Sequence, residues 1–92
     1  MKKLIFIACD TDKISEVKNI IAQTSNNKFN IGYKFGLEFL YSKNGRDFIS
    51  KIKRKKIFLD LKLNDIPVTC SKALMSLKDL KNINYITLHA NA

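Results

Sequence analysis

The stretch from Phe58 to Thr69 places three ionisable side chains directly behind an apolar run. Asp60 and Lys62 are two residues apart, so in an extended strand both point to one side and the leucines around them to the other. Asp65 follows three residues later, where Ile66-Pro67 should end the strand, because proline lacks an amide hydrogen and restricts the residue before it. A carboxylate and an ammonium then share one wall, with a second carboxylate at its mouth. The same spacing also suits an ordinary ion pair at a strand end, so its surroundings must decide.

Length and composition indicate one soluble globular domain at most, which we place over residues 1–92. The 92 residues are 46% hydrophobic and 27% charged, and no stretch approaches the ~18 apolar residues of a membrane span. The basic, apolar start could suggest a signal peptide, but the run is short and Asp10 and Asp12 end it at once. A cytoplasmic protein is therefore expected. Cys9 and Cys70 lie far apart, which favours reduced thiols over a disulfide or a metal site.

The net charge of +9 raises the question of nucleic-acid binding, centred on the cluster Lys51–Lys56. Lysine, isoleucine and asparagine are abundant along the whole chain, so the charge is typical of a general compositional bias. The cluster is also expected at a helix C-terminus, where cations interact favourably with the helix dipole. No interleaved aromatic residues or nucleic-acid motif accompany it. We therefore expect neither a nucleic-acid nor a membrane partner.

Apolar periodicity predicts alternating strands and helices. The expected strands are Leu4–Ala8, Phe29–Lys34, Ile57–Lys62 and Tyr85–Leu88, the first and third apolar enough to be covered on both faces. The expected helices run from a Thr11 or Asp12 cap to Thr24, from Leu37 to Arg54 with an interruption near Asn44-Gly45, and from Pro67 to Leu80. The last of them is expected to face inward with Leu74, Leu77 and Leu80. Gly36 is expected to allow a sharp turn after the second strand. This pattern predicts an α/β fold of parallel βαβ units with right-handed crossovers, the four strands in the order 1-2-3-4 and the three helices on one side.

Polar residues fall at the C-terminal ends of all four expected strands. They are Asp10, Lys34, Asp60 with Lys62, and His89. In barrel-type and open α/β folds, ligands and catalytic groups are found at that edge. The agreement among four strand ends favours a functional site over an incidental ion pair, and we expect Lys34, Asp60 and Lys62 to converge there with Asp10 nearby.

These features resemble a known family, the orotidine 5'-phosphate decarboxylases. The matching parts are the strand end at Asp10, Tyr33–Phe39, Phe58–Pro67 and the strand end Thr87–Ala90, which correspond in order to that family's first four strands. The resemblance covers the whole chain and implies the N-terminal half of a TIM (β/α)8 barrel. It also implies decarboxylation of orotidine 5'-phosphate to UMP in pyrimidine biosynthesis, a carbon-carbon lyase activity without cofactor or metal.

The resemblance implies a role for particular residues. The family's catalytic Lys-Asp-Lys-Asp tetrad falls on Lys34, Asp60, Lys62 and Asp65, the last reaching a neighbouring site across a dimer interface. The substrate-binding positions fall on Asp10 at the ribose, and on Lys34, Ile66 and Thr69. Two positions depart from the common pattern: Asn64 replaces a histidine and Val68 an asparagine, and neither belongs to the tetrad.

The chemistry fits these residue types. Loss of the carboxylate from carbon six of a pyrimidine leaves a carbanion that no cofactor delocalises, so a fixed cation and a ready proton are needed. Lys62 can supply both, and flanking carboxylates would keep its ammonium charged. Asp60 would press against the substrate carboxylate in the ground state. A sugar-phosphate decarboxylase or aldolase of the same superfamily is an alternative. That branch carries a glutamate in place of Lys34 and lacks the Ile66-Pro67 pair.

The chain is short for a complete barrel, which typically has about 250 residues and binds phosphate in loops after strands seven and eight. We therefore expect a truncated N-terminal fragment that is inactive by itself, because remote phosphate binding contributes to catalysis. Its expected partners are the nucleotide substrate and either a second copy in a homodimer or a separately encoded C-terminal half. Another possibility is a non-catalytic half-barrel that associates with itself and so covers its open edge strands.

Overall fold

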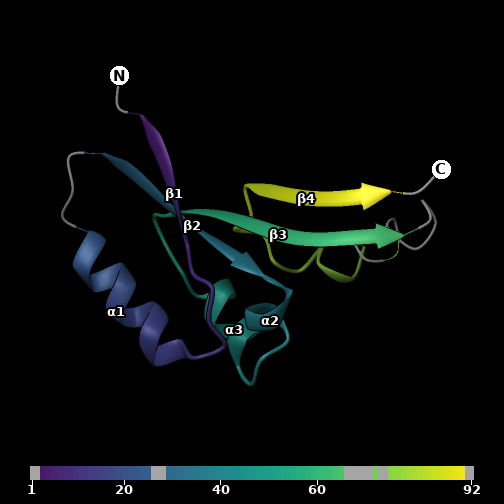
Figure 1. Ribbon diagram of the computed structural model, residues 1–92, viewed down its shortest axis with the longest axis horizontal. Coiled ribbons are helices and arrows are strands. Elements are labelled where there is room, and N and C mark those ends of the chain that lie inside the picture. Colours follow the sequence, from purple (N-terminus) through teal and green to yellow (C-terminus); the bar gives the residue numbers. More distant parts are fainter. Residues whose placement is uncertain (1–2, 26–28, 66–71, 73–74, 91–92) are drawn as a thin grey trace.

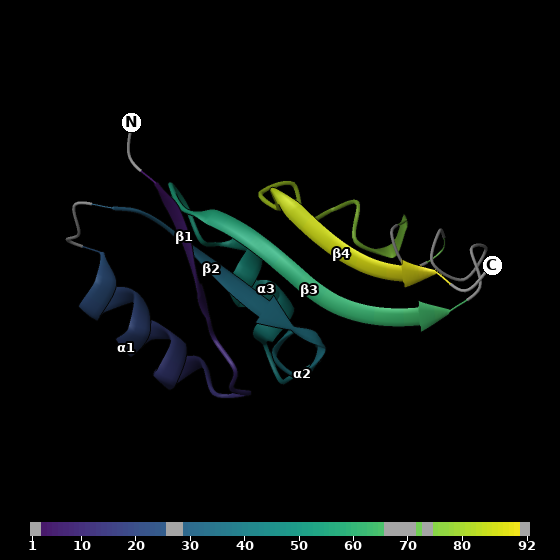
Figure 2. The same cartoon turned by 45° about the horizontal axis from the view of Figure 1, so that its top comes forward.

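The computed structural model describes residues 3–25, 29–65, 72 and 75–90, and its centre is a parallel sheet of four strands (Figure 1). These are β1 (Leu4–Ala8), β2 (Asn30–Gly36), β3 (Lys56–Asp65) and β4 (Tyr85–Ala90), paired in chain order. The helices are α1 (Ile14–Thr24), α2 (Leu37–Leu40) and α3 (Gly45–Ser50), and they lie on one side of the sheet (Figure 2). The predicted α/β fold and strand order are confirmed.

The hydrophobic core lies between the sheet and these helices. Alternate residues of the two central strands face the helices, as a period of two requires. The fully buried core side chains include Tyr33, Phe35, Ile57 and Leu59 of the strands, with Val17, Phe39 and Ile49 of the helices. Burial of one such side chain contributes about 1.5–3 kcal/mol, so this layer holds the strands in place.

The opposite face of the sheet carries a cluster of aromatic rings. The ring of Phe6 on β1 lies 5.4 Å from the rings of both Phe58 and Tyr85, each at a nearly perpendicular angle. Phe6 reaches β3 and β4 across β2 because Gly32 leaves space there. A Cβ atom at Gly32 would lie 2.5 Å from Phe6 Cε1 and 2.9 Å from the Cβ of Lys56. Tyr85 is 46% exposed, so this aromatic layer is open to solvent.

The expectation that the first strand is covered on both faces is wrong. Ile5 is 40% exposed and Ala8 is also exposed. Within the described residues β1 pairs only with β2, so it forms an edge of the sheet.

The start of α1 differs from the predicted cap. Lys13 occupies the N-cap position without a side-chain hydrogen bond, so neither Thr11 nor Asp12 caps the helix directly. The hydroxyl of Thr11 instead accepts a hydrogen bond from the amide of Lys13 at 3.1 Å and donates one to Glu16 Oε2 at 2.6 Å. Thr11 therefore stabilises the turn just before the helix and does not cap the helix itself.

The predicted interruption of the second helical region is confirmed, but the region is shorter than expected. Asn44 adopts a left-handed conformation with φ of 66° between α2 and α3. Gly45 follows because a Cβ atom there would lie 1.9 Å from the carbonyl oxygen of Phe39. Gly36 keeps an extended conformation at the start of α2, with φ of −98° and ψ of −175°. The chain therefore passes directly from strand to helix at Gly36, as predicted, but with a φ that other residues also adopt.

The basic cluster begins at the C-terminus of a helix, as predicted, but most of it lies beyond that helix. Helix α3 ends at Ser50, Lys51 is its C-cap, and Lys56 opens β3. Arg54 between them has a left-handed φ of 63°. The residues from Lys53 onward lie beyond the last helical turn, so the helix dipole does not account for their charge.

The segment before β4 is tied to α3 by polar contacts. Arg46 bonds to the Ser76 carbonyl at 2.8 Å and forms an ion pair with Asp79. Leu77 and Leu80 are buried, as predicted. Lys72, Met75 and Ser76 are helical, whereas residues 77–79 form a turn, so the helix does not reach Leu80 as expected. Pro67 and Leu74 lie outside the described residues.

No helix in the described part of the chain is long and apolar enough to cross a membrane.

Strand β3 runs to Asp65, three residues past its expected end at Lys62. Its pairing with β4 shifts partway: Asp60 is level with Thr87, but Asn64 is level with His89. Strand β3 therefore carries extra residues between Asp60 and Asn64, as in a β-bulge. The simple alternation that linked Asp60 and Lys62 in the sequence does not extend through this irregularity.

Candidate active site

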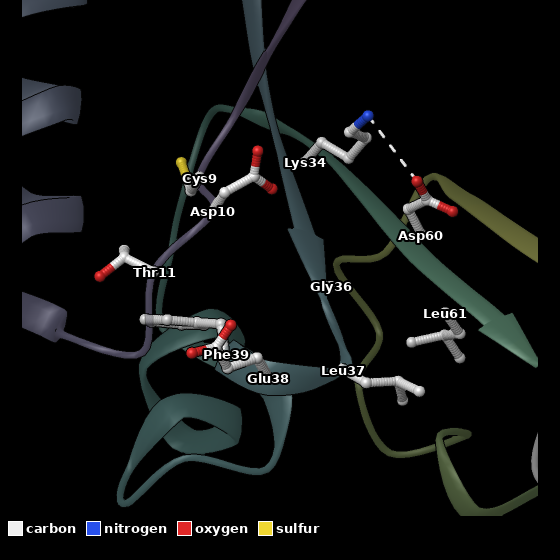
Figure 3. Close-up of a pocket in the computed structure, with 10 residues that line it drawn as sticks. All are labelled: Cys9, Asp10, Thr11, Lys34, Gly36, Leu37, Glu38, Phe39, Asp60 and Leu61. Carbon is white, nitrogen blue, oxygen red and sulfur yellow. Dashed lines mark ion pairs between the residues drawn. The ribbon is translucent and has the colours of Figure 1, made fainter.

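A cavity of about 380 Å³ lies beyond β1, beside the end of β2 and against β3 (Figure 3). It forms there because the chain leaves β1 and β2 at the same edge of the sheet, as parallel strands require. The lining residues come from the segment after β1, from β2, α2 and β3, and are Cys9, Asp10, Thr11, Lys34, Gly36, Leu37, Glu38, Phe39, Asp60 and Leu61.

Lys34 and Asp60 form an ion pair across the two central strands. Lys34 lies level with Phe58, two residues before Asp60, so both charged side chains share the face opposite the helices. Lys34 Nζ lies 3.7 Å from Asp60 Oδ2, with the two side chains 35% and 14% exposed. Figure 3 shows the ammonium directed at the carboxylate. The predicted convergence of these two residues is therefore present, and Lys34 does not point among the helices.

Asp10 is held beside Lys34 by the backbone. The amide of Cys9 donates a hydrogen bond to the carbonyl oxygen of Lys34 at 2.8 Å, and the amide of Thr11 donates to the carbonyl of Cys9 at 3.0 Å. These two bonds fix the residue between them, and Asp10 lines the cavity as expected. Three of the predicted site residues thus meet at one place: Asp10, Lys34 and Asp60.

Cys9 lines the same cavity but is unsuited to nucleophilic catalysis. Its side chain is 1% exposed and its thiol contacts the carbonyl oxygen of Ile7 at 3.8 Å. Burial raises the pKa of the Cys9 thiol to about 11, and the neighbouring Asp10 carboxylate contributes to the shift. Because the thiolate is the reactive form, this thiol stays protonated and inert at neutral pH.

Two polar residues at the cavity, Thr11 and Glu38, were not predicted. Both lie just after a strand end, Glu38 in the first turn of α2, and that position was the available signal. With Glu38 included, the cavity carries the carboxylates of Asp10, Glu38 and Asp60 and the ammonium of Lys34. Within the described residues, no three potential metal ligands lie close enough to hold an ion. Because three carboxylates and only one ammonium line the described cavity, its charge disfavours an anionic ligand.

Other predicted site residues cannot be placed. The backbone of Lys62 and Asp65 belongs to β3, but their side chains lie outside the described part of the structure. Ile66 and Thr69 also lie outside it. The backbone of His89 pairs with Asn64, beyond the levels of both Lys34 and Asp60 in the sheet.

Parallel strands in chain order, helices on one side and charged residues gathered at the carboxyl edge define the class of this protein: an α/β protein built as the N-terminal half of a TIM barrel. Comparison with known families makes the assignment particular. Residues 3–92 match the family described as "Orotidine 5'-phosphate decarboxylase / HUMPS family", and the chain belongs to this family.

Curated relatives agree with that assignment. The chain is 39% identical over 87 residues to the orotidine 5'-phosphate decarboxylase of Listeria innocua serovar 6a, covering 92% of this chain and 36% of the relative. It is 40% identical over 92 residues to the same enzyme of Staphylococcus saprophyticus subsp. saprophyticus, covering 98% and 38%. The chain thus spans little more than a third of the length of these relatives. No solved structure gives a significant match.

Proposed function

We propose that this chain provides the N-terminal half of an orotidine 5'-phosphate decarboxylase, with its catalytic residues on the open face of the sheet. The observation that carries the proposal is the Lys34–Asp60 ion pair, 3.7 Å long, beside Asp10 at the carboxyl edge. The chain's similarity to curated enzymes of that name supports it. The product would be UMP, formed in the cytoplasm as part of pyrimidine synthesis.

The proposed catalytic residues are Lys34, Asp60, Lys62 and Asp65, with Asp10, Lys34, Ile66 and Thr69 binding the substrate. In the reaction the bond between carbon six and the carboxyl carbon breaks, carbon dioxide leaves and the electron pair stays on carbon six. The Lys62 ammonium stabilises that carbanion and donates a proton to it. Asp60 disfavours the substrate carboxylate in the ground state, and the ion pair with Lys34 orients the Asp60 side chain.

Under this proposal, residues 1–92 need the remaining strands of the barrel in order to catalyse the reaction. The described cavity has more acidic than basic side chains, whereas the substrate carries a negatively charged phosphate and a carboxylate. The remaining barrel strands must supply the phosphate contacts and the other wall of the pocket, because binding energy from the phosphate lowers the barrier at the reacting carbon. The open aromatic face around Phe6 is the surface that those strands would cover.

The test is to measure UMP formation by the purified chain, first unaided and then mixed with a polypeptide that supplies strands five to eight. We expect activity only in the mixture, and its loss in Lys62→Ala. Activity of the 92-residue chain by itself would contradict the need for the second half. Activity of the mixture that survives Lys62→Ala would contradict the assigned residues.

A second candidate is a non-catalytic half-barrel that associates with itself. The observation that favours it is the exposed apolar layer, since Phe6, Phe58 and Tyr85 pack together yet Tyr85 stays 46% exposed. Two copies could cover these rings on one another, or a homodimer could place Asp65 in a neighbouring site. Analytical ultracentrifugation with and without the strand five to eight polypeptide separates these cases. A stable homodimer that does not exchange for the mixed complex would favour self-association.

A further inference from the structure

An apolar groove lies between α1 and the C-terminal end of α3, on the helical side of the sheet. Its volume is about 350 Å³, and its floor is formed by Ile21, Ala22, Phe48 and Ile52. A second hollow of about 440 Å³ continues it along α1 as far as Ile14. From Ile14 to Ala22 the groove follows about two turns of α1, roughly 12 Å.

The floor of this groove is held in place from below. Ile21, Phe48 and Ile52 all pack against the core, and the ring of Phe48 meets that of Phe39 edge-on at 6.0 Å. The side-chain amide of Asn82 donates a hydrogen bond to the carbonyl oxygen of Ile52 at 3.1 Å. A ligand would therefore meet a preformed surface and would not need to order it.

The rim of the groove is basic. It carries Lys18, Lys51, Lys53 and Lys55. Lys51 pairs with Asp47, Nζ to Oδ2, at 2.9 Å. Across the described part of the chain, none of the other three has an ion-pair partner. The floor is apolar and its rim is positively charged. A complementary ligand would therefore have an apolar side flanked by negative charges.

We propose that this groove is a docking site for an acidic amphipathic helix of a partner protein. A helix with apolar residues at i, i+3, i+4 and i+7 fits an elongated apolar groove, and acidic residues beside that stripe would meet the rim lysines. Each exposed pair contributes little, so the floor provides the affinity and the rim selects the partner. Nucleic acid fits less well, because the floor is aliphatic apart from Phe48 and offers no stacking platform.

The first test measures binding of a fluorescein-labelled synthetic helix with leucine at those positions and glutamate beside them, by anisotropy at about 0.15 M salt. We expect saturable binding that weakens about tenfold in the triple variant Lys18→Glu, Lys53→Glu, Lys55→Glu. The matched control is Lys72→Glu, Lys78→Glu, Lys81→Glu, an equal change of charge at exposed lysines outside the groove, which should keep the original affinity. An equal loss in both variants, or no binding by the unmodified chain, would overturn the proposal.

The second test separates groove binding from attraction between opposite charges. Ala22→Arg adds positive charge but fills the exposed floor, whereas Gln23→Arg adds the same charge next to it on α1. We expect Ala22→Arg to weaken peptide binding about tenfold and Gln23→Arg to leave it unchanged or stronger. Unimpaired binding by Ala22→Arg would overturn the proposal. So would tighter capture by phosphatidylglycerol vesicles than by the peptide, which would assign the surface to a membrane.

Discussion

Phe58 and Leu59 are neighbours on β3, yet their side chains lie in different surroundings. Leu59 is fully buried in the core between the sheet and the helices. Phe58 lies on the open face, where it meets the rings of Phe6 and Tyr85, and Tyr85 is nearly half exposed. The helical face therefore provides the stability of this chain. The open face carries the charged pair of the candidate site and a layer of rings suited to the inside of a barrel.

The largest loss of stability is expected from a substitution in the core on the helical face. Leu59→Ala should lower the free energy of unfolding by about 2–5 kcal/mol, because it leaves a cavity in a packed core. Phe58→Ala should cost only about 1–2 kcal/mol, since its ring is partly exposed and has only ring contacts of modest strength to lose. Urea denaturation of both variants measures the difference. Equal losses would mean that the two faces are packed alike.

On the open face, the ring of Phe6 lies against Gly32. The Cβ added by Gly32→Ala would lie 2.5 Å from the ring of Phe6 and 2.9 Å from the Cβ of Lys56, so the aromatic layer must shift. We expect a loss of about 1–3 kcal/mol in unfolding free energy. Replacing Phe6 by alanine in the same chain should recover part of that loss, which a double-mutant cycle would measure. Strict additivity of the two changes would show that the Phe6 ring does not lie over Gly32.

Cys9 and Asp10 are the next adjacent pair with contrasting surroundings. The pKa of the Cys9 thiol is raised from 9.0 to about 11 in the folded chain, so the folded state holds this proton more tightly than the unfolded state. Stability is therefore unaffected below pH 9 and falls as the pH rises toward 11, by on the order of 1–2 kcal/mol. Urea denaturation at several pH values in a Cys70→Ala background tests this, with Cys9→Ala as the control that removes the slope. A slope that persists in Cys9→Ala would assign it to another group.

The smallest expected effect on stability comes from the charged pair itself. Lys34→Ala and Asp60→Asn should each change the free energy of unfolding by less than about 1 kcal/mol, because Lys34 is one-third exposed and the pair is screened by water. Thermal unfolding of both variants measures this. A loss as large as that of Leu59→Ala would show that the pair holds the fold together, and would weaken its assignment to the candidate site.

The parts of the fold that follow from local pattern were predictable, and those that depend on neighbouring strands were not. Apolar runs ending in polar residues predicted the strand order and the meeting of Lys34 with Asp60. The irregularity between Asp60 and Asn64 arises from pairing with β4, so alternation along β3 gave no sign of it. The helical spacing of Phe48, Ile49 and Ile52 favoured extending the second helix to Arg54, but α3 ends at Ser50. The exposure of β1 was not predicted, because an apolar strand sequence indicates burial on both faces whether or not a neighbouring strand covers it.

We propose that the open face becomes a decarboxylase site when the rest of the barrel covers it. The most direct measurement joins residues 1–92 to the C-terminal part of the Staphylococcus saprophyticus enzyme, to which the chain is 40% identical, and assays the fusion with orotidine 5'-phosphate. We expect the fusion to release carbon dioxide and form UMP. Asp60→Asn or Lys62→Ala should each abolish this activity, with the folded fusion intact by circular dichroism. A folded fusion without activity, or one whose activity survives Lys62→Ala, would contradict the claim.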